Sequence, residues 1–180
     1  IVWQDMVSGA KHPGNFLVGA VPFFQISVKD DAYSLFHRDE KEWRDQFEDE
    51  LEQMMSTLHN CVSIGCWVPF NEGWGQFDAR KACEMIWRMD QTRTIDHASG
   101  WHDQKFGEIK SWHVYFKQYR FEPDEYNRAV VLSEFGGYNH RVEGHCFNRR
   151  DFGYKKFDSV NSYIFALRDL YKGEVLPAWR

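Results

Sequence analysis

Excess positive charge, phosphate-binding loops and long apolar runs are absent from this sequence. Its 22 Lys and Arg residues are outnumbered by 27 Asp and Glu, which gives a formal net charge of −5. Nucleic-acid binders need a basic face, so we expect no nucleic-acid partner. No stretch approaches the roughly 20 apolar residues of a membrane-spanning helix, so we expect no membrane partner either.

The motifs of several large enzyme classes are also missing. Neither G-x-G-x-x-G nor G-x-x-x-x-G-K-[ST] occurs, which argues against a dinucleotide-binding protein or a P-loop protein. Ser99 and Ser133 have a histidine and an acid nearby in the sequence, but neither lies in a G-x-S-x-G elbow. We therefore do not expect a serine hydrolase.

Cysteine is sparse and shows no metal-binding spacing. The four cysteines form no C-x-x-C pair, and we interpret them as buried free thiols rather than disulfides or metal ligands: Cys61, Cys66, Cys83 and Cys146. Cysteine usage therefore does not indicate a cellular compartment.

The stretch "NHRVEGHCF" contains three side chains that could bind a metal, His140, Glu143 and His145. H-E-x-x-H is not matched, and the two histidines are too unevenly spaced to share one helical face. We expect a loop at this position, with His145 near a substrate subsite. We expect no metal and no organic cofactor.

The sequence does contain a regular alternation of apolar patterns, in a chain long enough for a substantial core. Apolar spacings of three and four predict helices over 41–58, 76–89 and 158–170. Short apolar runs predict strands over 1–6, 61–70, 94–100, 108–116 and 129–137. Residues 11–38, which include Pro13 and Pro22, are irregular and predict a long loop.

The order of these elements indicates the fold class. "CVSIGCWVPF" shows no polar alternation, so we expect a strand that is buried on both faces of a parallel sheet. Repeated strand–helix alternation predicts an α/β fold, either a doubly wound sheet or a (β/α)8 barrel. Polar residues gather at the carboxyl ends of the predicted strands, where a barrel keeps its active site, and this favours the barrel.

Two glutamates end apolar strands in matching contexts, Glu72 in "NEGWG" and Glu134 in "SEFGGY". Desolvation can raise the pKa of a carboxyl group and fit it for general acid catalysis, while a hydrogen-bonded carboxylate stays ionised and fits a nucleophile. Glycosidic bond cleavage needs both roles. The alternative for each glutamate is an exposed loop acid.

Aromatic residues make up 17% of the chain, and sugar rings stack on such side chains. Six lie within a few residues of predicted strand ends, although a place in the core explains any one of them equally well: Trp74, Trp101, Trp112, Tyr115, Phe135 and Tyr138.

Four motifs in this order, "WVPFNEGWGQFD", "TRTIDHASGW", "HVYF" and "LSEFGGY", resemble the catalytic barrel of glycoside hydrolase family 2. That family includes β-galactosidases, β-glucuronidases and β-mannosidases. The resemblance runs from Trp3 to about Tyr154. It implies a retaining double-displacement mechanism without a cofactor, and it leaves open which sugar is cut.

The resemblance also assigns roles to individual residues. Glu72 matches the family's general acid/base, and Glu134 matches the nucleophile that forms the glycosyl-enzyme intermediate. Asn71 matches the amide that hydrogen-bonds the sugar 2-hydroxyl. His113 and Tyr115 match positions that line the subsite or orient the nucleophile. Trp101 and Asp5 match sugar contacts less closely.

Aligned in this way, the predicted strands correspond to strands three to seven of the barrel. Strands one, two and eight, and the β-sandwich domains that usually precede the barrel, are not matched. We therefore expect residues 1–180 to be a fragment of a glycoside hydrolase barrel, with the remaining domains of a longer parent chain as partners. The resemblance leaves open oligomerisation and the compartment, bacterial periplasm or cytoplasm.

Two alternatives to this function stay open. One is a non-catalytic, carbohydrate-binding fragment of such an enzyme. The other is an α/β hydrolase of different chemistry.

Overall fold

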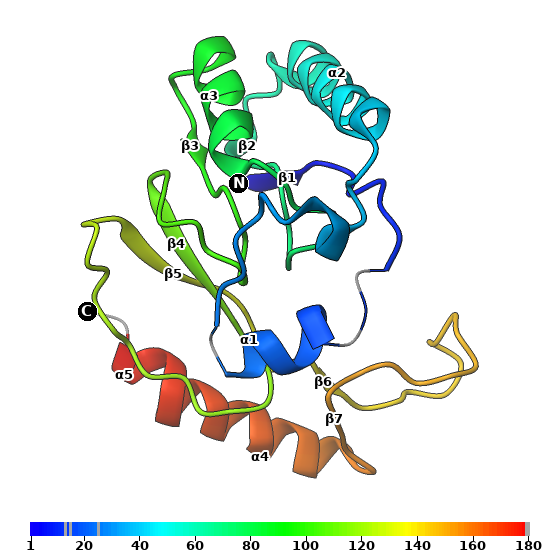
Figure 1. The fold of residues 1–180 in the computed structure, drawn as a ribbon. Coiled ribbons are helices and arrows are strands. Elements are labelled where there is room, and N and C mark those ends of the chain that lie inside the picture. Colours follow the sequence, from blue (N-terminus) through cyan, green and yellow to red (C-terminus); the bar gives the residue numbers. More distant parts are fainter. Residues whose placement is uncertain (13, 15, 25, 179–180) are drawn as a thin grey trace. The chain divides into compact units, whose positions relative to one another are not determined.

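The structure, a computed structural model, describes residues 1–12, 14, 16–24 and 26–178, so that Pro13 lies outside the described residues. The strands are β1 (Val2–Asp5), β2 (Ile64–Val68), β3 (Thr94–Ile95), β4 (Ile109–Val114), β5 (Ala129–Phe135), β6 (Tyr138–Asn139) and β7 (Lys155–Lys156). The helices and helical turns are η1 (Phe16–Ala20), α1 (Val21–Phe23), η2 (Tyr33–Phe36), α2 (Lys41–Leu58), α3 (Ala79–Met89), α4 (Val160–Leu170), η3 (Tyr171–Val175) and α5 (Leu176–Ala178). The chain is thus mixed α/β with short parallel strands, as the alternation predicted (Figure 1).

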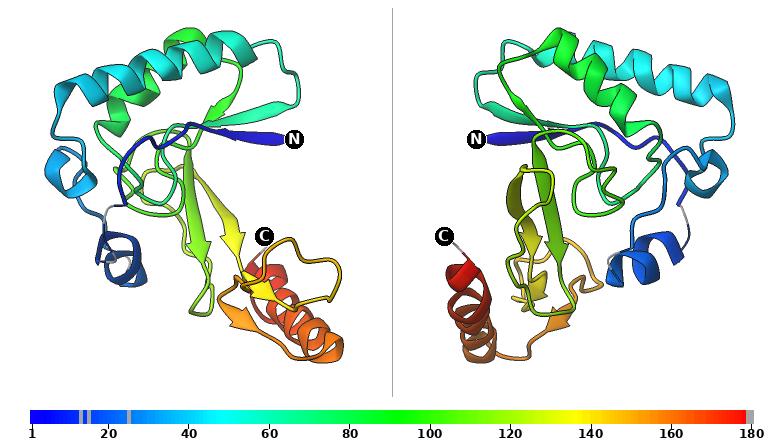
Figure 2. Two further views of the ribbon diagram at one scale, coloured as in Figure 1. Left: turned by 90° about the vertical axis from the view of Figure 1, so that its right-hand side faces the viewer. Right: turned by 60° about the vertical axis from the view of Figure 1, so that its left-hand side comes forward.

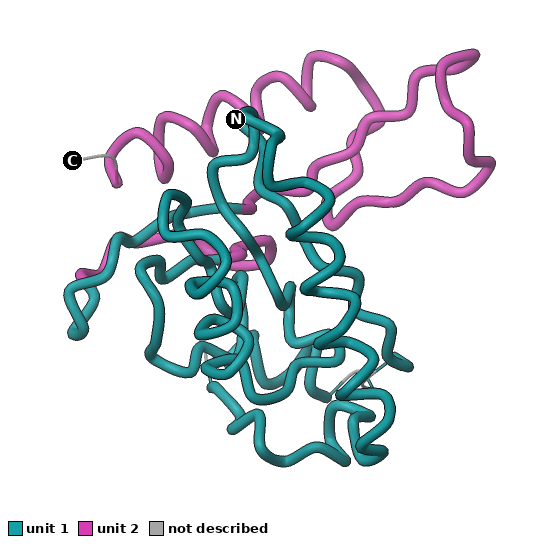
Figure 3. The backbone as a smooth tube through the Cα atoms, turned by 90° about the horizontal axis from the view of Figure 1, so that it is seen from above, with its two compact units in different colours: residues 1–112, 124–133 teal, residues 113–123, 134–180 magenta. Residues whose placement is uncertain are grey.

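The chain divides into two compact units (Figure 3). The first unit contains residues 1–112 and 124–133, and the second contains residues 113–123 and 134–180.

The first unit contains a parallel sheet in the order β1-β2-β3. β2 is the central strand, with Trp3 opposite Cys66 on one side and Ile95 opposite Trp67 on the other. Cys66, Trp67 and Val68 are all at most 1% exposed. The prediction of a strand that is buried on both faces of a parallel sheet is therefore confirmed.

Helices α2 and α3 pack side by side on one face of this sheet (Figures 1 and 2). Phe47, Leu51 and Met55 recur every four residues along α2, so they form one buried stripe. Ile86 of α3 and Trp67 of β2 belong to the same apolar cluster as this stripe. This cluster is the main core of the first unit.

A smaller cluster lies against the other face of β2. Cys66 and Val68 pack there with Ile109 of β4, and Val131 of β5 packs against them. The β4–β5 contacts advance in step, as in a parallel pair: Ala129 N–H donates to Glu108 O, and Ser133 Oγ donates to Trp112 O. The sheet of the first unit is therefore covered by helices on one face and by β4 and β5 on the other.

The second unit is built around α4 and the short parallel pair β6–β7. Ser159 caps α4, because its Oγ accepts a hydrogen bond from the Ser162 N–H at 3.2 Å. The predicted helix over 158–170 is confirmed, while β6 and β7 were not predicted. Among the described residues of the chain, no helix combines the length and apolarity needed to cross a bilayer.

Two sequence predictions need correction. Residues 11–38 are not a plain loop, because η1, α1 and η2 form short helical turns there. All four cysteines are free as predicted, but only Cys66 and Cys83 are buried. Cys61 lies in the connection before β2 and Cys146 lies in the loop after β6, and both are exposed.

Candidate active site

The seven predicted site residues divide between the two units. The first unit holds Asp5, Asn71, Glu72 and Trp101, and the second holds His113, Tyr115 and Glu134. The roughly 5 Å separation that a retaining enzyme needs between its two carboxyl groups stays a prediction.

In the first unit, backbone pairing fixes the Asn71–Glu72 dipeptide just beyond β2. Asn71 forms a parallel bridge with Ser99, and the Glu72 N–H donates to Ser99 O at 2.9 Å. The Ser99 N–H in turn donates to Phe70 O at 2.8 Å. The sheet therefore continues past the ends of its regular strands and carries Asn71 and Glu72 to its carboxyl edge.

The backbone of Glu72 is strained at this edge. Its φ is +54°, a left-handed conformation that costs a non-glycine residue about 1–2 kcal/mol. Gly73 follows with φ +71°, and a Cβ added there would lie 2.3 Å from His102 Cδ2. Strained backbone of this kind clusters at functional sites, and here it coincides with the predicted acid/base.

Arg38 holds the turn that follows Glu72. Its Nε donates to Gly75 O at 2.8 Å, and its Nη2 donates to Ser8 O. The residue is 2% exposed, and burial lowers the pKa of its guanidinium to about 10. Arg38 thereby joins the segment after β1 to the segment after β2. No motif or strand end in the sequence marks this arginine.

Trp101 lies close to this edge of the sheet, whereas Asp5 lies farther back along it. Trp101 is half-buried and follows Gly100, whose N–H donates to Ser111 Oγ at 2.9 Å, so it lies just beyond the Ser99 bridge. Asp5 is opposite Val68, the last residue of β2, which precedes Asn71 by three residues. At about 3.3 Å per residue, Asp5 is therefore set back from the Asn71 row by about 10 Å.

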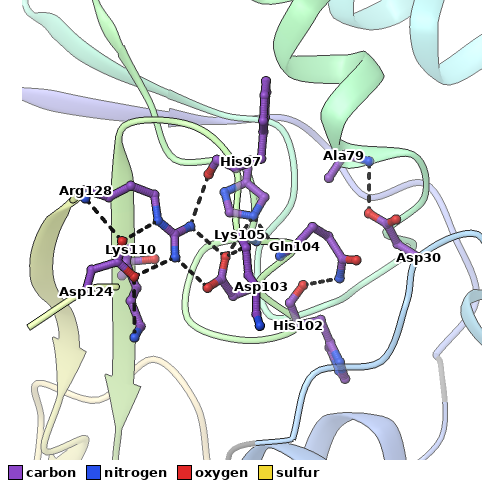
Figure 4. A network of polar contacts seen from close by, with 12 residues as sticks. Asp30, Ala79, His97, His102, Asp103, Gln104, Lys105, Lys110, Asp124 and Arg128 are labelled. Atoms are coloured by element: carbon purple, nitrogen blue, oxygen red, sulfur yellow. Dashed lines mark hydrogen bonds and ion pairs between the residues drawn. The ribbon is translucent and has the colours of Figure 1, made fainter. Parts of the chain in front are cut away.

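A partly buried ionic network supports the loop after Trp101 (Figure 4). The Arg128 guanidinium donates to both Asp103 oxygens at 2.7 Å, and to Asp124 Oδ1 and Oδ2 at 2.9 and 3.0 Å. These hydrogen bonds lower the pKa of Asp124 to about 2. Burial acts to raise the pKa of Asp103, but its bonds to Arg128 and His97 outweigh burial and lower it. No motif in the sequence marks this network.

The second unit brings its three predicted residues together. The Tyr115 hydroxyl donates to Glu134 Oε2, and His113 Nε2 lies 3.7 Å from Glu134 Oε1. The His113 side chain is fully buried, whereas the Glu134 side chain is 49% exposed. Glu134 is thus oriented by two neighbours and still reachable from solvent. A carboxylate in this setting can act as a nucleophile.

Three aromatic side chains that the sequence did not predict, Phe116, Phe152 and Tyr154, form a group with Tyr115 beside Glu134. The Tyr154 ring stacks on the Tyr115 ring, with centroids 4.3 Å apart and an interplanar angle of 27°. Phe116 and Phe152 contact Tyr154 edge-on, at 4.8 and 5.9 Å between centroids. All four aromatics belong to the second unit.

In the loop after β6, two of the three side chains that could bind a metal make other contacts. His140 Nδ1 lies 2.8 Å from Phe157 O, and its ring packs against Tyr163. Glu143 and His145 are exposed, and Glu143 Oε1 accepts a hydrogen bond from Arg141 at 3.1 Å. These contacts fit the predicted loop. The proximity of His145 to a subsite stays a prediction.

The chain matches no protein-family model and no curated protein.

Proposed function

We propose that this chain is the central part of a retaining β-glycosidase, with Glu72 as acid/base and Glu134 as nucleophile. The observation that carries the proposal is the environment of Glu134. This carboxylate ends an apolar strand, accepts a hydrogen bond from the Tyr115 hydroxyl and lies beside buried His113. An exposed loop acid would need neither neighbour.

The fold that goes with this proposal is a partial (β/α)8 barrel in which β1 to β5 are strands three to seven. Two features of the first unit support it. Helices cover one face of the parallel sheet, and on the other face Ile109 and Val131 pack against Cys66 and Val68. Side chains from successive strands fill a barrel interior in this way.

In the first step of the proposed reaction, a Glu134 oxygen attacks the anomeric carbon of the sugar. The bond from that carbon to the leaving oxygen breaks, and the Glu72 carboxyl group gives its proton to the leaving oxygen. In the second step, Glu72 takes a proton from water, the water oxygen attacks the anomeric carbon, and the bond to Glu134 breaks. The configuration at the anomeric carbon is retained.

The neighbouring residues have separate tasks in this scheme. The Tyr115 hydroxyl orients the attacking oxygen of Glu134, because its hydrogen bond fixes the carboxylate plane. Asn71, held by its bridge to Ser99, presents its amide to the sugar 2-hydroxyl. Trp101 offers a half-buried ring beside the same edge.

A fluorosugar experiment tests the nucleophile. The protein is incubated with 2-deoxy-2-fluoro-β-glycosyl fluorides of galactose, glucuronic acid and mannose, digested, and analysed by mass spectrometry. We expect one of these sugars to add a single fluoroglycosyl group to the peptide that contains Glu134. Glu134→Gln should abolish the label, and Glu143→Gln, an exposed acid of the same unit, should keep it.

The second candidate is a carbohydrate-binding protein without turnover. It is favoured by the exposure of the aromatic group beside Glu134, where Phe116, Phe152 and Tyr154 are 64%, 83% and 37% exposed. Retention on a sugar column without labelling by any fluorosugar would support this candidate and reject the enzyme.

A further inference from the structure

We propose that Tyr154 is a positioning residue that holds the Tyr115 ring in the orientation from which its hydroxyl donates to Glu134. The catalytic meaning of this inference rests on the proposed function of Glu134. Its geometry comes only from contacts within the second unit.

The stacking contact is the first argument. Tyr115 follows the last residue of β4, so the regular strand no longer fixes the direction of its side chain. The Tyr154 ring lies nearly parallel to the Tyr115 ring, with centroids 4.3 Å apart. A face-on contact of this kind restricts rotation about the side-chain bonds of Tyr115. The direction of its hydroxyl is restricted with it.

The backbone under Tyr154 is the second argument, because it ties this ring to the strand that carries Glu134. The Tyr154 N–H donates to Gly137 O at 2.8 Å. Gly137 lies three residues after Glu134 and has φ +62°, and a Cβ added there would be 2.4 Å from Tyr154 Cδ2. Because Gly137 has no side chain, the Tyr154 ring can occupy this space.

Two further rings contact Tyr154 from the sides. Phe116 contacts it edge-on at 76°, and Phe152 contacts it at 64°. A ring confined in this way can transmit a fixed orientation to Tyr115. The chain of contacts therefore runs from Gly137 to Tyr154, from Tyr154 to Tyr115, and from Tyr115 to Glu134.

The Tyr154 ring, rather than its hydroxyl, performs this task. Tyr154→Phe keeps the stacked ring, whereas Tyr154→Ala removes it. We expect Tyr154→Ala to slow fluorosugar labelling of Glu134 about tenfold, because misplacing a reacting group costs rate steeply. Tyr154→Phe should label at the wild-type rate. Phe147→Ala, at a fully exposed position of the same loop, is the matched control and should also label at the wild-type rate.

A spectroscopic readout separates this inference from the proposed function. With 3-fluorotyrosine at position 115, the ¹⁹F resonance reports the environment of the Tyr115 ring. We expect Glu134→Gln to shift this resonance in the wild-type and Tyr154→Phe proteins. In Tyr154→Ala the same substitution should shift it far less, because the hydroxyl no longer points to residue 134.

Each combination of results decides one question. A Glu134-dependent shift that disappears in Tyr154→Ala supports the positioning role, even if no fluorosugar labels the protein and the proposed function fails. If Tyr154→Ala keeps the full shift, or labels as fast as the wild type, Tyr154 does not position Tyr115 and the inference is overturned.

Discussion

Glu72 and Glu134 both lie near the carboxyl end of an apolar strand and precede a glycine-containing turn, but the chain holds them by different means. Glu72 is fixed through its backbone, by the hydrogen bond to Ser99 O and by a left-handed φ of +54°. Glu134 lies within the regular strand β5 and is oriented through its side chain, by Tyr115 and His113. The sheet holds the backbone of one acid, and two side chains lie against the carboxylate of the other.

The two units also differ in how deeply their ion pairs are buried. In the first unit, Arg128 binds Asp103 and Asp124 with its side chain only 4% exposed. In the second unit, Arg141 also binds two acids, Glu143 and Asp151, but Glu143 is 87% exposed. The first unit therefore supports its acid with well-buried charge pairs and a large apolar core. The second unit relies on contacts between partly exposed aromatic rings.

The largest predicted effect separates the two acids by chemistry. With a dinitrophenyl glycoside, which needs no proton to leave, Glu134→Gln should lose turnover by several orders of magnitude because no nucleophile remains. Glu72→Gln should keep a rapid release of the first equivalent of dinitrophenol and then stall. Stopped-flow absorbance measures both phases.

Azide provides the control for this comparison. A small anion can replace water in the second step without a general base, so azide should restore turnover to Glu72→Gln and yield a β-glycosyl azide. In Glu134→Gln it should not yield the β-anomer. Equal behaviour of the two variants would contradict the assignment of distinct roles.

The second prediction compares the two arginines. Arg128→Met removes the main ion-pair partner of the buried Asp124 carboxylate and of the partly exposed Asp103 carboxylate, so the free energy of unfolding should fall by about 3 kcal/mol. Arg141→Met breaks contacts with exposed acids and should cause a much smaller change. Urea unfolding with hydrogen exchange measures each unit separately. Equal losses in the two variants would contradict the contrast between the units.

The stability of the first unit should also depend on pH through the carboxylates that bind Arg128. The folded-state pKa of Asp124 is lowered from 3.8 to about 2, so its contribution to stability is present above pH 3.8 and is lost as the pH falls toward 2. The lowered pKa of Asp103 acts in the same direction. In Arg128→Met, the stability of the first unit should depend less on pH across this range.

The sequence predicted those parts of the fold in which the pattern is local. The helix over 41–58 has the bounds of α2, because its apolar stripe repeats without interruption. The doubly buried strand around Trp67 was equally predictable from its lack of polar alternation. The turns in 11–38 were missed, because they are too short to establish a period.

Site residues were predictable from the sequence only where they lie at the end of an apolar strand. Glu72 and Glu134 lie at such ends, whereas Tyr154 and Arg128 do not. Tyr154 meets Tyr115 only because the chain returns along β6 and β7, and Asp103 meets Arg128 from the loop after Trp101. Such contacts depend on the path of the chain in space, which periodicity and turn residues do not specify.

The smallest predicted effect tests the backbone difference between the two acids directly. Glycine tolerates a left-handed φ, so Glu72→Gly should be more stable than Glu72→Ala by about 1 kcal/mol. Within a strand, glycine costs conformational entropy, so Glu134→Gly should be less stable than Glu134→Ala by about 0.5–1 kcal/mol. Chemical unfolding of the four variants measures both differences.

The two differences should therefore have opposite signs. Each Ala/Gly pair differs only by a Cβ, so the comparison removes the lost carboxylate from both sides. If alanine were more stable than glycine at both positions, residue 72 would have relaxed out of its left-handed conformation, and the sheet edge would not hold the acid/base as proposed. Opposite signs would mean that the first unit maintains a strained backbone at Glu72 at a measurable cost in stability, as expected of a residue fixed for catalysis.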